Sequence, residues 1–143
     1  MTAERFSRGR EVAFDAPVGR VIGCRDGEVI RATGIPYARA GRFEKQVPMR
    51  DLGEFEARKW SPSAPQNPAE EPPLFGPELR ELPVSEDCQN LSITLPGDIR
   101  EGEKLPVIVW IHGGSYVAGA GDSSFTDPAR WVGERRAIVV TVS

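Results

Sequence analysis

Two glycines and a serine, Gly113–Ser115, stand one residue after the apolar, β-branched run Val107–Ile111. Such a run is typical of a strand that is buried on both faces in the middle of a parallel sheet. Glycines after the strand let the backbone turn sharply and come close to a ligand. Backbone N–H groups presented at the carboxyl edge of a sheet can stabilise a negatively charged oxygen. An ordinary glycine-rich turn between a strand and a helix is the alternative interpretation.

The only histidine of the chain, His112, stands immediately before the two glycines. A serine nucleophile needs a base within hydrogen-bond reach, and a histidine this close in the sequence is badly placed to act on Ser115. Ser115 also lacks the Gly-x-Ser-x-Gly pattern of a nucleophile elbow, which occurs nowhere in the chain. We therefore interpret His112 as a residue that braces the glycine loop through hydrogen bonds, and we reject Ser115 as a nucleophile.

A helix and a second strand are predicted after the glycine loop. Asp127 and Pro128 are typical of the N-cap and the first position of a helix, which must end by about Arg136. The β-branched run 137–142 then predicts another buried strand. Strand, helix and strand form a βαβ unit, so the two strands should be parallel with a right-handed crossover. A parallel sheet needs further strands and helices on both faces, so we expect the chain to be an incomplete part of an α/β domain.

An antiparallel hairpin is predicted nearer the N-terminus. Two β-prone runs, 18–24 and 28–33, flank Asp26-Gly27, and this dipeptide is typical of tight hairpin turns. Residues 1–11 before them are expected to form a charged leader that frays. Pro36 cannot donate a hydrogen bond to a neighbouring strand and should end the second run.

The middle of the chain carries few signals of regular structure. Segment 38–59 is expected to be irregular, with Arg42-Phe43 and Trp60 as its candidate anchors. Seven of the 13 prolines lie within 61–84, and their density excludes regular structure there. This stretch is either a linker or a wall of a binding gorge. From 87 to 95 the alternation of Leu and Ile with Ser and Thr predicts a further strand.

The composition is that of a soluble globular protein, with 39% of the 143 residues apolar and 27% charged. The 18 basic and 21 acidic residues are interspersed and give a net charge of −3, which excludes a nucleic-acid or anionic-membrane footprint. No apolar run approaches the ~18 residues of a membrane span, and residues 1–10 lack the apolar segment of a secretory signal. We therefore expect a cytoplasmic protein, with Cys24 and Cys88 as free thiols.

Four blocks of sequence, taken in order, resemble the N-terminal part of a type-B carboxylesterase. This α/β-hydrolase family includes para-nitrobenzyl esterases and cholinesterases. The blocks are Gly34–Ala38 with Arg42-Phe43, Trp60 with Pro65-Gln66, Ser85–Cys88, and Pro106–Tyr116. The resemblance covers residues 18–143 and implies an α/β fold in which an N-terminal β-hairpin leads into a mixed sheet with a βαβ unit. It makes residues 1–143 the N-terminal segment of a single α/β-hydrolase domain.

The resemblance also implies roles for the glycine loop. In this family the N–H groups at the positions of Gly114 and Ser115 form an oxyanion hole, and the position of Gly113 supplies the turn. Ser115 stands where the family usually has a third glycine, but its side chain leaves the N–H in place. The nucleophilic serine, the acid and the base of the family follow later in the chain, so the resemblance places all three outside residues 1–143.

Further residues match positions of the same family. Arg42 and Glu86 match a buried ion pair, although two solvated charges are the common outcome for such residues. Tyr116 and Phe125 are candidates for lining the acyl or alcohol pocket. Trp110 lies inside the predicted strand and is expected to pack in the core.

The sequence thus predicts one segment of a serine carboxylesterase that hydrolyses small-molecule carboxylic esters without a cofactor or a metal. The rest of the same polypeptide, or a complementary chain, is expected to complete the sheet. A non-catalytic binding or adhesion protein on the same fold is the alternative. A nucleotide-binding βαβ unit is disfavoured, because Gly119 and Gly121 lie too far past the strand and lack the third glycine of that motif.

Overall fold

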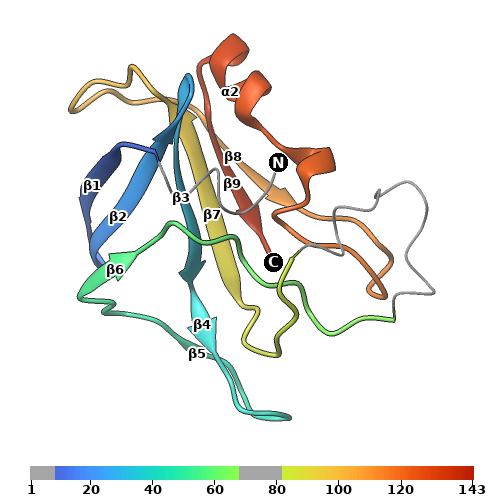
Figure 1. The fold of residues 1–143 in the computed structure, drawn as a ribbon. Coiled ribbons are helices and arrows are strands. Elements are labelled where there is room, and N and C mark those ends of the chain that lie inside the picture. The colour runs from blue at the N-terminus through green and yellow to red at the C-terminus, as the bar shows by residue number, and fades with distance from the viewer. Residues whose placement is uncertain (1–8, 68–81) are drawn as a thin grey trace.

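The computed structural model describes residues 9–67 and 82–143 (Figure 1). Its main feature is a seven-stranded mixed sheet in the order β1-β2-β3-β7-β9-β8, with β6 paired to β2 beside this path. The strands of this sheet are β1 Glu11–Ala16, β2 Gly19–Asp26, β3 Val29–Pro36, β6 Glu54–Glu56, β7 Asn90–Pro96, β8 Val107–Ile111 and β9 Ile138–Val142. A separate two-stranded sheet joins β4 Ala38–Arg39 to β5 Val47–Pro48. Within the described ranges, the helical elements are the 3₁₀ turn η4 Ser124–Thr126 and the helix α2 Ala129–Arg135.

The predicted hairpin is confirmed as β2 and β3, which pair in antiparallel register from Cys24↔Arg31 to Asp26↔Val29. Only Gly27 and Glu28 connect the last pair, and Gly27 has a φ of 59°, which a residue without a Cβ adopts at little cost. The strand β3 ends at Pro36, as predicted. An additional strand, β1, pairs with β2 along its whole length, and it lies where the sequence predicted no strand.

The predicted βαβ unit is also present. The strands β8 and β9 are parallel, with Val107 opposite Ile138 and Ile111 opposite Val142. Between them, α2 begins at Ala129, one residue later than predicted, and Arg136 ends it in a left-handed conformation. Val132 of α2 is fully buried and forms one core cluster with Val29 and Val139, so the helix packs on one face of the sheet (Figure 1).

The strand β8 is not buried on both faces, and this prediction is wrong for the chain. It is the last strand of the sheet order and pairs only with β9 among the described residues. Val107, Val109 and Ile111 lie on the face of β8 opposite Ile108, which packs against the α2 cluster, and all three are exposed, with Ile111 retaining 77% of its accessible surface. The run has the apolar character of a central strand, but residues 9–67 and 82–143 contain no element that covers its outer edge.

A second core cluster holds the segment after the hairpin against the sheet. Val21, Ala32, Ile35 and Ala57 are its buried members, and Phe55 of β6 packs against them. The segment 38–59, predicted to be irregular, therefore contributes three short strands, β4, β5 and β6, and a buried core residue, Ala57. The prediction that Phe43 anchors this segment is wrong. The Phe43 side chain is exposed in the loop between β4 and β5.

The proline-rich stretch between 61 and 84 is described only at its two ends. Ser63 and Val84 form an isolated parallel bridge that brings these ends together. The prediction of a linker or gorge wall for residues 68–81 lies outside the described residues. Within the described part of the chain, no helix is long and apolar enough to cross a membrane.

Candidate functional site: the loop after strand β8

The loop that follows β8 turns through a run of left-handed residues. Gly114, Ser115 and Tyr116 have φ values of 126°, 55° and 63°. A Cβ on Gly114 would overlap the carbonyl oxygen of Ala118, so only glycine fits this position without movement of the loop. The left-handed backbone thus begins at Gly114. Gly113, predicted to supply the turn, directly precedes this backbone, and a Cβ on it would meet open space.

The Gly114 carbonyl group is hydrogen-bonded within this loop, whereas the N–H groups of Gly114 and Ser115 are not. The Gly114 carbonyl oxygen accepts hydrogen bonds from the N–H groups of Val117 at 3.0 Å and Ala118 at 3.1 Å, which close the turn. The N–H groups of Gly114 and Ser115 donate no hydrogen bond to any group in 9–67 or 82–143. Two adjacent backbone donors are therefore available at the carboxyl end of β8, which is the edge where α/β sheets bind ligands.

The imidazole of His112 contacts the backbone of the loop. Its Nδ1 lies 2.8 Å from the carbonyl oxygen of Gly113, a distance at which a protonated Nδ1 donates a hydrogen bond. The same ring nitrogen lies close to Gly119, where an added Cβ would come within 2.6 Å of it. The His112 side chain therefore contacts the start of the loop through a hydrogen bond and lies beside Gly119 at its end, while its bracing role stays a prediction.

The candidate pocket aromatics are only partly brought together. Phe125 borders a shallow apolar hollow that Trp110, Trp131 and Ile108 also line. Trp110 is 46% exposed, so the prediction that it packs in the core is wrong, because β8 lies at the edge of the sheet. Tyr116 is fully exposed and is not among the residues that line this hollow.

Arg42 and Glu86 form an ion pair at the surface. Arg42 Nη1 and Glu86 Oε1 lie 3.4 Å apart, and the two side chains are 71% and 59% exposed. The predicted pairing is present, but the prediction that the pair is buried is wrong, because the β4–β5 excursion that carries Arg42 projects away from the sheet (Figure 1). At this exposure such a pair contributes at most about 1 kcal/mol.

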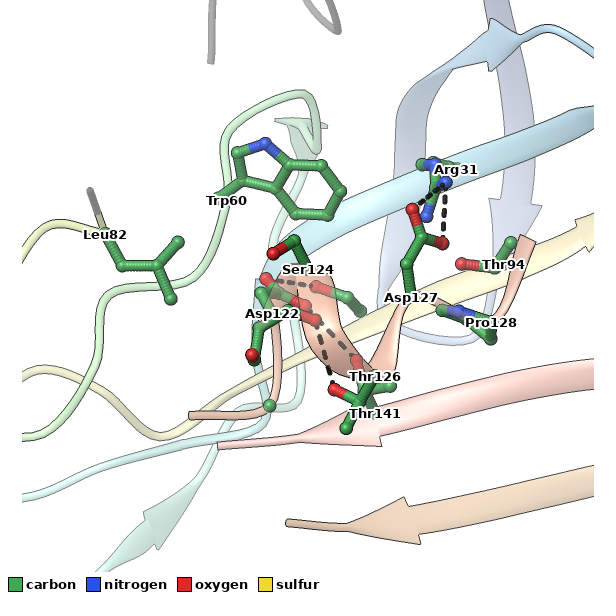
Figure 2. Close-up of a pocket in the computed structure, with 13 residues that line it drawn as sticks. Arg31, Trp60, Leu82, Thr94, Asp122, Ser124, Thr126, Asp127, Pro128 and Thr141 are labelled. Carbon is green, nitrogen blue, oxygen red and sulfur yellow. Dashed lines mark hydrogen bonds and ion pairs between the residues drawn. The ribbon is translucent and has the colours of Figure 1, made fainter. Parts of the chain in front are cut away.

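A different arginine is buried with its charge among the described residues. Arg31 of β3 is 2% exposed, and its Nε donates to Asp26 Oδ2 at 2.8 Å. Its Nη2 lies 2.9 Å from both carboxylate oxygens of Asp127, as Figure 2 shows. The guanidinium carbon also lies 5.5 Å from the ring centroid of Trp60. Asp127 Oδ1 accepts the N–H of Ala129 at 2.9 Å, so the same carboxylate caps the start of α2.

A second carboxylate, Asp122, lies shortly after the glycine loop in the sequence and connects three segments; Figure 2 shows its side chain beside Thr141. Its Oδ2 accepts the N–H of Ser61 at 2.7 Å and the hydroxyl of Ser92 at 2.8 Å. Its Oδ1 accepts the hydroxyl of Thr141 at 3.2 Å. The chain after the glycine loop is thereby fixed to β7, to β9 and to the segment that follows β6. Neither this network nor that of Arg31 was predicted, because partners so far apart in sequence leave no local signal.

Cys24 and Cys88 form no disulfide and are thiols, as predicted. Burial, with a smaller effect from the Asp26 carboxylate, raises the pKa of the Cys24 thiol, and burial also raises the pKa of the Cys88 thiol. Both groups are therefore protonated at neutral pH. Among the described residues, no three His, Cys, Asp or Glu side chains gather in a way that could hold a metal ion.

An antiparallel hairpin that leads into a mixed sheet, with a parallel βαβ unit and a glycine loop after its first strand, defines the N-terminal part of an α/β hydrolase. The sequence model of the carboxylesterase family matches residues 11–143. The chain therefore belongs to the carboxylesterase family, and the resemblance to type-B carboxylesterases is confirmed.

Relatives with known names agree with this assignment. Carboxylesterase 3B of Mus musculus is 32% identical over 148 residues, which cover 90% of this chain and 24% of the relative. Para-nitrobenzyl esterase of Bacillus subtilis is 32% identical, over 87% of this chain and 26% of the relative. Probable N-octanoylanthranilate hydrolase AqdA2 of Rhodococcus erythropolis is 34% identical, over 90% of this chain and 28% of the relative.

Solved esterase structures match the fold as well. A thermophilic PNB esterase superposes with a TM-score of 0.78 at 31% identity, over 92% of this chain and 27% of that structure. Juvenile hormone esterase from Manduca sexta superposes with a TM-score of 0.77 at 30% identity, over 93% of this chain and 26% of that structure. The chain thus spans about a quarter of the length of these relatives.

Proposed function

We propose that this chain supplies the oxyanion-hole loop of a serine esterase that hydrolyses carboxylic esters. The observation that carries the proposal is the pair of N–H donors at Gly114 and Ser115. A left-handed turn holds them at the end of β8, and neither donates a hydrogen bond to a group in 9–67 or 82–143. Membership of the carboxylesterase family and the names of the relatives support ester hydrolysis as the reaction.

In the proposed reaction a serine hydroxyl attacks the ester carbonyl carbon while a histidine accepts the hydroxyl proton. The carbonyl oxygen then becomes an oxyanion, and fixed N–H donors stabilise it without reorganising during the step. Gly114 and Ser115 provide two of these donors, and His112 holds the loop through the Gly113 carbonyl. Serine, acid and base come from outside residues 1–143, since the sequence contains neither a Gly-x-Ser-x-Gly elbow nor a second histidine.

The first test follows from this division of roles. Residues 1–143 alone should neither hydrolyse para-nitrophenyl acetate nor take up a fluorophosphonate probe at Ser115. The same residues joined to, or combined with, a segment that carries the nucleophile should do both, with the probe on the elbow serine. Mass spectrometry locates the label, and labelling of Ser115 would contradict the proposal.

The second test separates the Ser115 backbone from its side chain. Ser115→Ala keeps the N–H donor and removes only the hydroxyl, so the complete esterase should retain kcat/KM within about tenfold of wild type, which corresponds to at most ~1.4 kcal/mol. Steady-state kinetics on para-nitrophenyl acetate measure the effect. A loss of several orders of magnitude would show that the hydroxyl takes part in the chemistry and would overturn the assignment of the loop.

A further inference from the structure

The side-chain amide of Gln66 forms two hydrogen bonds to a single residue at the far end of the glycine loop. Gly119 N donates to Gln66 Oε1 at 2.8 Å, and Gln66 Nε2 donates to the carbonyl oxygen of Gly119 at 3.1 Å. The amide therefore satisfies both backbone polar groups of Gly119, as a neighbouring strand would. Gln66 Nε2 also donates to the Ala64 carbonyl oxygen at 3.1 Å, which fixes the amide relative to its own segment.

Gly119 packs directly against the first residues of the loop. A Cβ on Gly119 would overlap the carbonyl oxygen of Gly113 and come within 2.6 Å of His112 Nδ1. Its own φ of 116° is one that residues with a Cβ rarely adopt. A Cβ on Gly114 would likewise meet the Ala118 carbonyl and the Gly119 nitrogen. The position of Gly119 therefore limits the positions of Gly113 and Gly114 through close backbone contact, beside the ring of His112.

We propose that Gln66 is a positioning residue of the oxyanion hole, which holds the Gly114 and Ser115 N–H groups in their reactive geometry by clamping Gly119. This inference rests on the proposed esterase function. The clamp acts across 53 residues of sequence, from the segment after β6 to the loop after β8. Without it, Gly119 loses the two hydrogen bonds that join it to the segment after β6, and it can move away from Gly113. Displacement of a catalytic donor by about 1 Å is enough to lower turnover up to 10²-fold.

Two variants of nearly unchanged side-chain length test the clamp in the complete esterase. Gln66→Met removes the two hydrogen bonds to Gly119 together with the one to Ala64. Gln66→Glu removes the Nε2 donor and places a carboxylate oxygen beside the Gly119 carbonyl. Because the interaction acts on the transition state, both should lower kcat by about 10- to 100-fold while KM stays within about threefold. A residue that only fills space would tolerate both changes. Gln46→Met, at an exposed position on the β4–β5 excursion, is the matched control and should leave kcat unchanged.

Two further readouts keep this test separate from that of the esterase function. Affinity for a trifluoromethyl ketone, whose serine adduct carries an oxyanion, should fall in parallel with kcat/KM. Hydrogen exchange at the Gly119 amide should become at least about tenfold faster in both variants, whether or not the protein is an esterase. An inactive wild type with a protected Gly119 amide would contradict the esterase function alone. Wild-type kcat in both variants would overturn the role of Gln66 alone.

If Gln66→Met does not fold, Gln66→Asn is measured in its place. This variant keeps an amide of similar polarity but is one methylene too short to reach both backbone groups of Gly119. It should show the same fall in kcat and the same faster exchange at Gly119, and normal values of both would overturn the proposal.

Discussion

Replacement of Gly114 by alanine is expected to lower the kcat of the complete esterase by about 10²–10³, because loss of one oxyanion donor has an effect of this size in related chemistry. Gly114 has a φ of 126°, and a Cβ at this position would overlap the Ala118 carbonyl oxygen. The loop can accept alanine only by moving residues 114–118. That movement displaces the N–H groups of Gly114 and Ser115 together. Steady-state kinetics with para-nitrophenyl acetate measure the loss.

Gly133→Ala is the matched control for this change. Gly133 lies within α2, its φ is not in the left-handed region, and a Cβ there would meet open space. Alanine is favoured over glycine inside a helix by about 1 kcal/mol, so this variant should keep full activity and gain slightly in thermal stability. Gly114→Ala with a kcat within tenfold of wild type, at a normal melting temperature, would contradict the role of the loop.

The elements predicted correctly from the sequence are those with local signals. The dipeptide Asp26-Gly27 identified the β2–β3 hairpin, and two β-branched runs around a short helix identified β8, α2 and β9. Besides the two-residue strands β4 and β5, the missed strands are β1 and β6, which carry two charged residues each, and β6 is only three residues long. Their pairing with β2 is set by the rest of the sheet and not by their own composition.

In the candidate site, too, the features with a local sequence signal were predicted and those that depend on distant parts of the chain were not. Glycines directly after a strand identify the loop at 113–115, because a left-handed turn next to crowded backbone requires them. Burial was predicted less well, since it depends on what covers a residue. Val107–Ile111 reads as a buried run but lies at an edge, and Arg42 has its ion-pair partner but remains exposed. The buried arginine, Arg31, has one partner five residues away and another 96 residues away.

Arg31→Met is expected to lower the free energy of unfolding by about 3 kcal/mol, at the low end of the cost of breaking a buried ion pair from one side. The Arg31 side chain is 2% exposed and binds Asp26 and Asp127, whose side chains are 27% and 23% exposed. Its removal leaves two partly buried carboxylates near each other without a cation. Their residual contact with water keeps the cost below that of a fully buried pair. Chemical denaturation measures the change.

Arg136→Met is the matched control, because Arg136 also binds two carboxylates, Asp98 at 2.9 Å and Glu103 at 2.8 Å. Its side chain is 43% exposed, so water replaces the lost contacts and the loss of stability should be far smaller. Asp127→Asn supplies a second comparison, since it keeps the acceptor for the Ala129 N–H and removes only the charge that faces Arg31. Equal losses for Arg31→Met and Arg136→Met would mean that burial adds nothing to this network, and that the hydrophobic clusters alone hold α2 against β3.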